Sequence, residues 1–305
     1  MRNAFANKIT ELAKKNKKII LLSGDIGNKL FNSFKKQNLG RFINCGVAES
    51  NMTTVAAGLA YAGFTPITYT IASFNVFKTI EQIKIDICYQ NLPVIIVGVG
   101  AGLSYSNLGT THHSIEDIGV LNSISNLNII CPADQKELIK LLPQIIKSGK
   151  PTYLRLGKKN EKQVYSGNCG SKIGKVEIIQ KGREICIFGT GNVLHNVISA
   201  SKNLKYNFKP QIVNIHSIKP FDKKNVLKYL KEFKKIIVVE EHIEAGGLSV
   251  MLKKLTSENR TNNKFICHNT GNKYLIGLGD KINAHKKVKL DSLSIKKSID
   301  KFYKM

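Results

Sequence analysis

The segment Arg41 to Gly63, RFINCGVAESNMTTVAAGLAYAG, predicts a strand that passes through a short loop into a helix. Its first seven residues, RFINCGV, form an apolar run, and the stretch SNMTTVAAGLAYAG that begins at Ser50 is rich in small residues with a helical pattern. Between them stands Glu49, beside Ser50 and Asn51, either of which could cap the helix. Taken alone, Glu49 is more simply a first-turn acid that complements the helix dipole.

The same strand-to-helix unit recurs on both sides of this segment. Helical patterns separate further apolar runs, which are KKIILLSGD (17–25), FTPITYTI (64–71), LPVIIVGVG (92–100), LNIICPA (127–133) and PTYLRLG (151–157). Strands that are apolar on both faces and alternate with helices are typical of a parallel sheet covered by helices.

The alternation stops near Lys158 and then restarts. The stretch KKNEKQVYSGNCGSKIGK (158–175) is polar and Gly-rich, and after it REICIFGTG (183–191), KPQIVNIHSI (209–218) and KKIIVVEEH (234–242) predict strands. We therefore expect an α/β chain of two doubly wound domains. The boundaries are a mainly parallel-sheet domain at 1–160, a linker at 161–175 and a smaller α/β domain at 176–305.

The composition limits the class of protein. Lys and Arg number 47 against 21 Asp and Glu, a formal net charge of +26, but the lysines are scattered and no nucleic-acid-binding fingerprint accompanies them. We interpret the excess as compositional bias with attraction to anionic ligands or an acidic partner, and expect no nucleic acid. No apolar run is long enough to span a membrane, and no signal-peptide pattern appears, so we expect a cytoplasmic protein. The six Cys show no metal-ligand spacing, so no metal is expected on this chain.

Two glycine-rich stretches follow strands, but neither completes a dinucleotide fingerprint. GVGAGLSYSNLG has Leu103 where the third glycine is needed, and GTGNVL has Leu194 there. Neither has the Lys-Ser/Thr pair of a P-loop. We interpret Gly98 and Gly100 as positions where the backbone turns tightly or approaches another group closely.

Two pairs of side chains are ambiguous by themselves. GTTHHSIED contains His112 and His113 without a further metal ligand at defined spacing, so a surface loop pair and a functional pair remain equally open. SFNVFKTIEQI places Phe74 and Phe77 one turn apart on one helix face. That arrangement is usually part of a core, although a ring near a helix start could also stack on a flat ligand.

Taken in order, several motifs resemble the C-terminal half of transketolase-type, thiamin-diphosphate-dependent enzymes. They are FINCGVAESNM (42–52), the run from Tyr69 to Asp134 that contains YTIASFNVF and GTTHHSIED, PTYLRLGK (151–158), HSIKPFD (216–222) and VVEEHIEAGGL (238–248). The likeness extends from about Asn3 to Ser257. It implies a pyrimidine-binding domain at 1–160 and a transketolase C-terminal domain at 176–305.

The resemblance also implies roles for the residues that bind the cofactor. Glu49 matches the glutamate of the family's G-[IV]-x-E motif, which hydrogen-bonds N1′ of the aminopyrimidine and so activates thiamin diphosphate. Phe74 matches the aromatic residue that stacks on the aminopyrimidine, and Phe77 is a second candidate. Gly46 and Gly100 would permit close approach of the backbone.

For the substrate, the resemblance implies contacts from His112, His113 and Lys158. His112 matches the histidine that lies near the thiazolium and the substrate hydroxyls, and His113 replaces a residue that is often Gln. Gly100 stands where a phosphate-binding histidine is common. Lys158 falls near a phosphate-binding arginine, but a lysine holds phosphate as a point charge, without the bidentate fork.

The chain also departs from full-length transketolases, because it has no GDG motif for the diphosphate and Mg²⁺. The resemblance therefore implies a split transketolase whose N-terminal, diphosphate-binding subunit carries Mg²⁺, in a heterotetramer of two large and two small chains. We expect this chain to transfer a two-carbon ketol unit from a ketose or ketose phosphate to an aldehyde. The alternatives are a deoxyxylulose phosphate synthase-like enzyme, a 2-oxoacid dehydrogenase beta subunit, a non-catalytic binding homologue and, last, a nicotinamide-dependent oxidoreductase.

Overall fold

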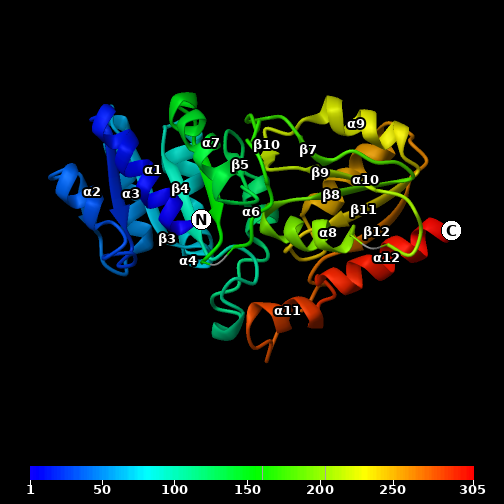
Figure 1. Cartoon of the computed structure of the whole chain (residues 1–305). Helices are drawn as coiled ribbons and strands as arrows, with labels where there is room; N and C mark the ends of the chain where they lie inside the picture. Colours follow the sequence, from blue (N-terminus) through cyan, green and yellow to red (C-terminus); the bar gives the residue numbers. More distant parts are fainter. Residues whose placement is uncertain (160, 203) are drawn as a thin grey trace.

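The computed structural model describes residues 1–159, 161–202 and 204–305, and within them the chain forms two sheets (Figure 1). The strands of the first sheet are β1 (Ile19–Ser23), β2 (Phe42–Asn44), β3 (Thr65–Ile71), β4 (Ile95–Val99), β5 (Asn128–Ile130), β6 (Thr152–Leu156) and β10 (Ser217–Lys219). Their order is β10-β5-β6-β4-β3-β1-β2, and every neighbouring pair is parallel except β10 with β5.

The second sheet has five strands within the described residues. They are β7 (Glu177–Gln180), β8 (Ile185–Gly189), β9 (Gln211–Asn214), β11 (Lys235–Val239) and β12 (Lys264–His268). In the order β12-β11-β8-β9-β7, all neighbours are parallel except β7 with β9.

Helices cover both faces of each sheet. The first sheet has α1 (Arg2–Lys15), α2 (Asn32–Gln37) and α7 (Gln135–Ser148) on one face, and α3 (Glu49–Tyr61), α4 (Ala72–Phe77), α5 (Ile80–Gln82), the π-helical segment η1 (Ile83–Tyr89) and α6 (Asp117–Asn122) on the other. The second sheet has α8 (Leu194–Ala200) and α12 (Ser292–Lys304) on one face, and α9 (Lys223–Glu232) and α10 (Leu248–Glu258) on the other. Short 3₁₀ turns η2 (Ser106–Leu108) and η3 (Gly191–Val193), with α11 (Lys281–Lys287), complete the chain.

The strand sequences explain this double covering. In β1, Ile19 and Leu21 enter the core under α1 and α7, whereas Ile20 and Leu22 enter the core under α3. Successive strand side chains point to opposite faces, so a fully apolar strand needs helices on both. The expected α/β class with two doubly wound, mainly parallel sheets is therefore confirmed.

One predicted strand is wrong in its extent. The stretch 209–218 forms two strands in different sheets, because β9 ends at Asn214 and β10 begins at Ser217. β10 pairs antiparallel with β5 and so extends the first sheet with a strand from the second half of the chain. The halves thus share a sheet as well as a core that is continuous between them.

The helical pattern between the apolar runs 64–71 and 92–100 does not form one continuous helix. α4 ends at Phe77, and the chain restarts in α5 and then the wider turn of η1. Such π-helical turns interrupt the regular ladder and frequently accompany functional sites. None of the helices in the described ranges is both long and apolar enough to cross a membrane.

The expected linker at 161–175 has no helix or strand, yet part of it is buried. Tyr165 and Ser171 each bind the buried carboxylate of Glu137 in α7, at 2.8 and 2.6 Å. Asn214 at the end of β9 donates to the same carboxylate, at 2.9 Å to each oxygen. Glu137 therefore fastens the linker and the second sheet to the first domain.

Candidate functional site

Glu49 lies in the first turn of α3, after the loop that follows β2. Gly46 in this loop has φ +68°, a left-handed value that glycine adopts without steric cost. The carboxylate is buried, since Glu49 is 3% exposed. The expectation that Ser50 or Asn51 caps the helix is wrong, because no side chain caps it and the Ser50 hydroxyl instead donates to the Lys78 carbonyl at 2.7 Å.

Lys78 covers this carboxylate and contacts a neighbouring ring. Its Nζ is 3.2 Å from Glu49 Oε2 and 4.8 Å from the centroid of the Phe74 ring. The Lys78 side chain is 52% exposed, so solvent screening leaves this ion pair worth about 1 kcal/mol or less. A ligand that donates a hydrogen bond to Glu49 can therefore displace the ammonium group at small cost.

Phe74 and Phe77 are not a core pair. Phe74 is half-buried and Phe77 is 44% exposed, so the two rings do not form the core pair that is usual for this spacing. The ring of Phe74 lies 5.1 Å from that of His112 in an edge-to-face arrangement. α4 thus presents one ring beside Glu49 and a second ring to the surface.

His112 stands between two aromatic rings. Besides Phe74, its imidazole faces Tyr105 at a centroid distance of 5.8 Å, and its Nδ1 is 2.9 Å from the Thr111 hydroxyl. Burial, together with the positive fields of His113 and Lys158, lowers the pKa of His112. A neutral imidazole at neutral pH can donate and accept protons at substrate hydroxyls.

His113 points elsewhere. It is 2% exposed, and its Nε2 lies 3.3 Å from the Ser106 carbonyl in η2. The side chain therefore supports the loop, and we do not place His113 among the substrate contacts.

Tyr105 was missed in the sequence, and Gly100 explains its position. Gly100 has φ +92°, and a Cβ there would lie 2.2 Å from the Tyr105 ring. The close approach expected at Gly100 is thus to this ring. Lys158, two residues after β6, holds its Nζ 4.3 Å from the Tyr105 centroid, so His112, Tyr105 and Lys158 form one row.

A buried ion pair holds the His112 loop against the sheet. Arg155 in β6 donates to Asp117 at 2.7 Å, to the Ser114 carbonyl at 2.7 Å and to the Glu241 carbonyl at 3.0 Å. The Tyr153 hydroxyl donates to the same Asp117 oxygen at 2.7 Å. Although burial opposes ionisation, the Arg155 guanidinium holds the pKa of Asp117 below its usual range.

These residues gather beyond the carboxyl ends of β2, β3, β4 and β6, the edge at which parallel sheets bind ligands. A buried carboxylate, a half-exposed ring, an imidazole and an ammonium group suit a flat heteroaromatic ring beside a polar, anionic substrate. Sequence spacing could have indicated Lys78, which follows Phe74 by four residues, whereas nothing in the sequence indicated Tyr105. In the described part of the chain, no three His, Cys, Asp or Glu side chains are arranged to hold a metal.

Residues 1–163 match the transketolase pyrimidine binding domain, and residues 174–267 match the transketolase C-terminal domain. The chain is 32% identical to an apulose-4-phosphate transketolase subunit of Phocaeicola vulgatus, over 85% of this chain and 84% of that protein. It is 29% identical to a 6-deoxy-6-sulfo-D-fructose transketolase subunit of a Clostridium species, over 85% of this chain and 81% of that protein.

A solved structure described as a split gene transketolase, an inactive beta4 tetramer, has the same fold. It superposes with a TM-score of 0.88 at 25% identity and covers 99% of this chain and 97% of its own. The match over nearly the full length of both chains excludes a fragmentary likeness. The chain therefore belongs to the thiamin-diphosphate-dependent transketolase family of transferases, as a C-terminal subunit of the split type.

Proposed function

We propose that this chain supplies the pyrimidine side of a thiamin diphosphate site in a cytoplasmic split transketolase. With its partner it would cleave a ketose or ketose phosphate beside the carbonyl and pass the two-carbon ketol unit to an aldehyde. The observation that carries this proposal is the buried carboxylate of Glu49 in the first turn of α3, near the half-buried ring of Phe74.

The residues present fit the aminopyrimidine of the cofactor. Glu49 offers a buried acceptor to N1′, and Phe74 offers a ring for stacking, with Phe77 as a second candidate. Gly46 leaves room, since a Cβ there would meet no atom within 4 Å. When bound, thiamin diphosphate supplies the carbon nucleophile that attacks the ketose carbonyl. Glu49 would hold the proton at N1′, and His112 would bind the substrate hydroxyls.

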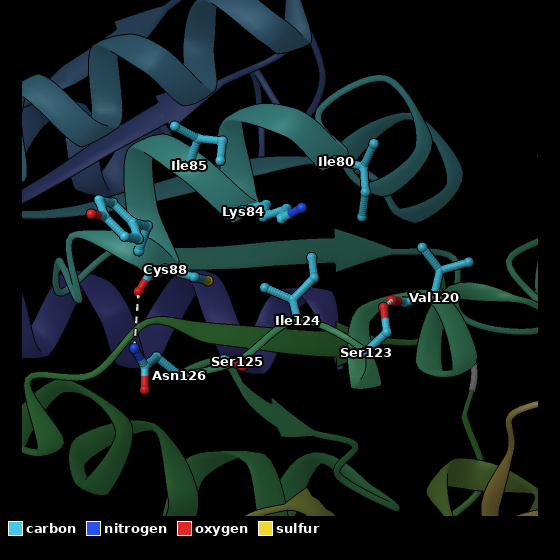
Figure 2. Close-up of a pocket in the computed structure, with 10 residues that line it drawn as sticks. Ile80, Lys84, Ile85, Cys88, Val120, Ser123, Ile124, Ser125 and Asn126 are labelled. Carbon is cyan, nitrogen blue, oxygen red and sulfur yellow. Dashed lines mark hydrogen bonds between the residues drawn. The ribbon is translucent and has the colours of Figure 1, made fainter.

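Exposed apolar side chains in the loop before Glu49 and along η1 support a partner subunit. Val47, in the loop before Glu49, is 72% exposed, and Ile85 and Tyr89 of η1 are 46% and 80% exposed. Side chains of η1 and of the segment after α6 line a mainly apolar groove of about 570 Å³. Figure 2 shows these side chains. Large exposed apolar side chains and an apolar groove favour a protein interface. We assign this region to contacts in a heterotetramer of two N-terminal and two C-terminal subunits, with Mg²⁺ on the N-terminal subunit.

The substrate we propose is a sugar or sugar phosphate. Lys158 lies at the end of the row that begins at His112 and can hold a phosphate as a point charge. The names of the two relatives contain a phosphorylated and a sulfonated sugar, which carry the same kind of tetrahedral oxyanion.

The test is ketol transfer by the reconstituted pair. An N-terminal subunit carrying GDG and a downstream Asn is co-purified with this chain, and transfer from xylulose 5-phosphate to ribose 5-phosphate is measured. Glu49→Gln should lower kcat about a hundredfold or more, because proton transfer contributes at least that much. Glu232→Gln, on the exposed face of α9, is the matched control.

Each alternative predicts a different outcome. Wild-type turnover by Glu49→Gln would exclude the proposed role of Glu49. Turnover of pyruvate in place of ketose phosphates would favour a deoxyxylulose phosphate synthase-like or 2-oxoacid dehydrogenase-like enzyme. A pair that binds no thiamin diphosphate would favour a non-catalytic homologue.

A further inference from the structure

The second half of the chain helps to line a cavity that Glu49, Phe74 and His112 do not line. This cavity, the junction cavity, has a volume of about 510 Å³ and lies where η2, the segment after β6, α8 and α11 meet. Its basic lining residues are Lys158, Lys159, Lys162, His195, Lys281 and His285. The volume suits a small metabolite.

The charge of the junction cavity is unbalanced. Of its two carboxylates, Asp280 accepts the Asn283 amide at the start of α11, and Glu161 lies 2.5 Å from the α-ammonium group of Met1. Among the described residues, Lys159 and Lys162 form no ion pair within 4.0 Å. Clustered cations along a concave wall raise the local concentration of anions.

The wall from the second half is fixed in place. Glu241, buried beneath it, binds His285 Nε2 at 2.6 Å and Lys281 Nζ at 3.2 Å. Ser106 in η2 donates to the Gly279 carbonyl at 2.8 Å and so fixes the opposite wall to the loop before α11. His195 lines the same cavity, where burial and the nearby Lys162 lower the pKa of its imidazole and a hydrogen bond with the Gln163 backbone opposes that shift.

The junction cavity also adjoins the candidate active site. Lys158 lines the cavity, and its ammonium group lies over the same Tyr105 ring that faces His112 on the active-site side. A phosphorylated sugar that reaches past Tyr105 would therefore have its phosphate near the basic wall.

We propose that the junction cavity binds a phosphate ester, with Lys159 and Lys162 contacting its phosphate oxygens. The phosphate can belong to the terminal group of the sugar substrate or to a separate phosphorylated ligand, since both present the same dianion. Where it belongs to the substrate, the inference rests on the proposed function.

Calorimetric titration of the full chain tests binding without any activity. Ribose 5-phosphate should bind saturably, inorganic phosphate should compete with it, and ribose should not bind. Lys162→Glu should weaken binding about tenfold or more, the loss expected for one charge-assisted contact. Lys224→Glu, on the exposed side of α9, makes the same change of charge away from the cavity and should bind like the wild type. Absence of saturable binding, or equal affinity of the Lys162→Glu variant and the wild type, would overturn the proposal.

Kinetics of the reconstituted pair then identify the source of the phosphate. If it is the substrate's, Lys162→Glu should raise KM for erythrose 4-phosphate and leave KM for glycolaldehyde and kcat unchanged. If it belongs to a separate ligand, both KM values should be unchanged and any response of the rate to added phosphate should be lost. A wild-type pair without ketol transfer would refute the proposed function, yet the calorimetric result would still decide whether the cavity binds phosphate.

Discussion

Replacing Arg155 by methionine should strongly destabilise the chain. Arg155 is 3% exposed, and Asp117, its partner at 2.7 Å, is fully buried. Removing one member of a buried ion pair costs about 3 to 5 kcal/mol, because the other charge stays buried without its partner. The variant also leaves the carbonyls of Ser114 and Glu241 without the donor that Arg155 provides, so we expect the upper part of that range.

The loss should depend on pH. In the wild type, the lowered pKa of Asp117 gives stabilisation that is present above its unfolded pKa of about 4 and is lost as the pH falls through the folded value. In Arg155→Met, burial without the cation should raise the pKa of Asp117 above the unfolded value. The difference in the free energy of unfolding between the wild type and the variant should therefore be largest near neutral pH and should shrink as the pH falls towards about 4.

Chemical unfolding at several pH values measures both effects. Arg183→Met, which removes an exposed guanidinium, is the control and should change the free energy of unfolding by about 0.5 kcal/mol or less. Adding Asp117→Asn to Arg155→Met should recover part of the loss and remove its pH dependence, because no buried charge remains. The reasoning would be refuted if Arg155→Met lowered the free energy of unfolding by only about 1 kcal/mol or less, or if the loss grew as the pH falls.

Two further predictions concern stability. Gly100→Ala should lower the free energy of unfolding by about 2 kcal/mol or more, because its Cβ would lie 2.2 Å from the Tyr105 ring in a residue with φ +92°. Gly46→Ala, whose Cβ would meet no atom within 4 Å, should lower it by about 1 kcal/mol. Equal losses in thermal unfolding would contradict the Tyr105 contact. His216 lies 3.0 Å from the Glu137 carboxylate. Burial lowers the pKa of His216, but the carboxylate outweighs burial and raises it. The ion pair should therefore stabilise the folded state below about pH 6.5, and this contribution should be lost as the pH rises through the folded pKa. Glu137→Gln should abolish that decline in the pH profile of unfolding, and a flat wild-type profile would contradict the coupling.

The sequence predicted most of the fold because the fold follows from local pattern. Each apolar run between helical patterns contains a strand of the structure. Because these strands are apolar on both faces, helices must cover both faces of the sheet, which gives the doubly wound architecture. The division of 209–218 into β9 and β10 could not be predicted, because the apolar pattern continues through Ile215 while the two strands enter different sheets. That choice depends on β5, which is distant in the sequence.

The position of Glu49 in the candidate site could be predicted from the sequence, whereas contacts that are made across loops could not. Glu49 sits in the first turn of α3 as its position after a strand indicated. Tyr105 reaches His112 and Lys158 only because Gly100 leaves room for its ring, and no spacing encodes that. His113 differs from its neighbour only in the direction of its side chain, which the turn of the loop decides.

The arrangement also explains why the second half remains joined to the first. The loop that carries His112 is held from both sides, because Arg155 links the Ser114 carbonyl to that of Glu241 in the second half. Beside this link, the Gly119 amide donates to His242 Nε2 at 3.0 Å, and a Cβ at Gly119 would lie 3.2 Å from Gly246. These contacts add to the backbone hydrogen bonds that Gly102 and Ser114 exchange at the base of the loop. The second half thus helps to fix the loop that carries His112, and so supports the role proposed for this residue.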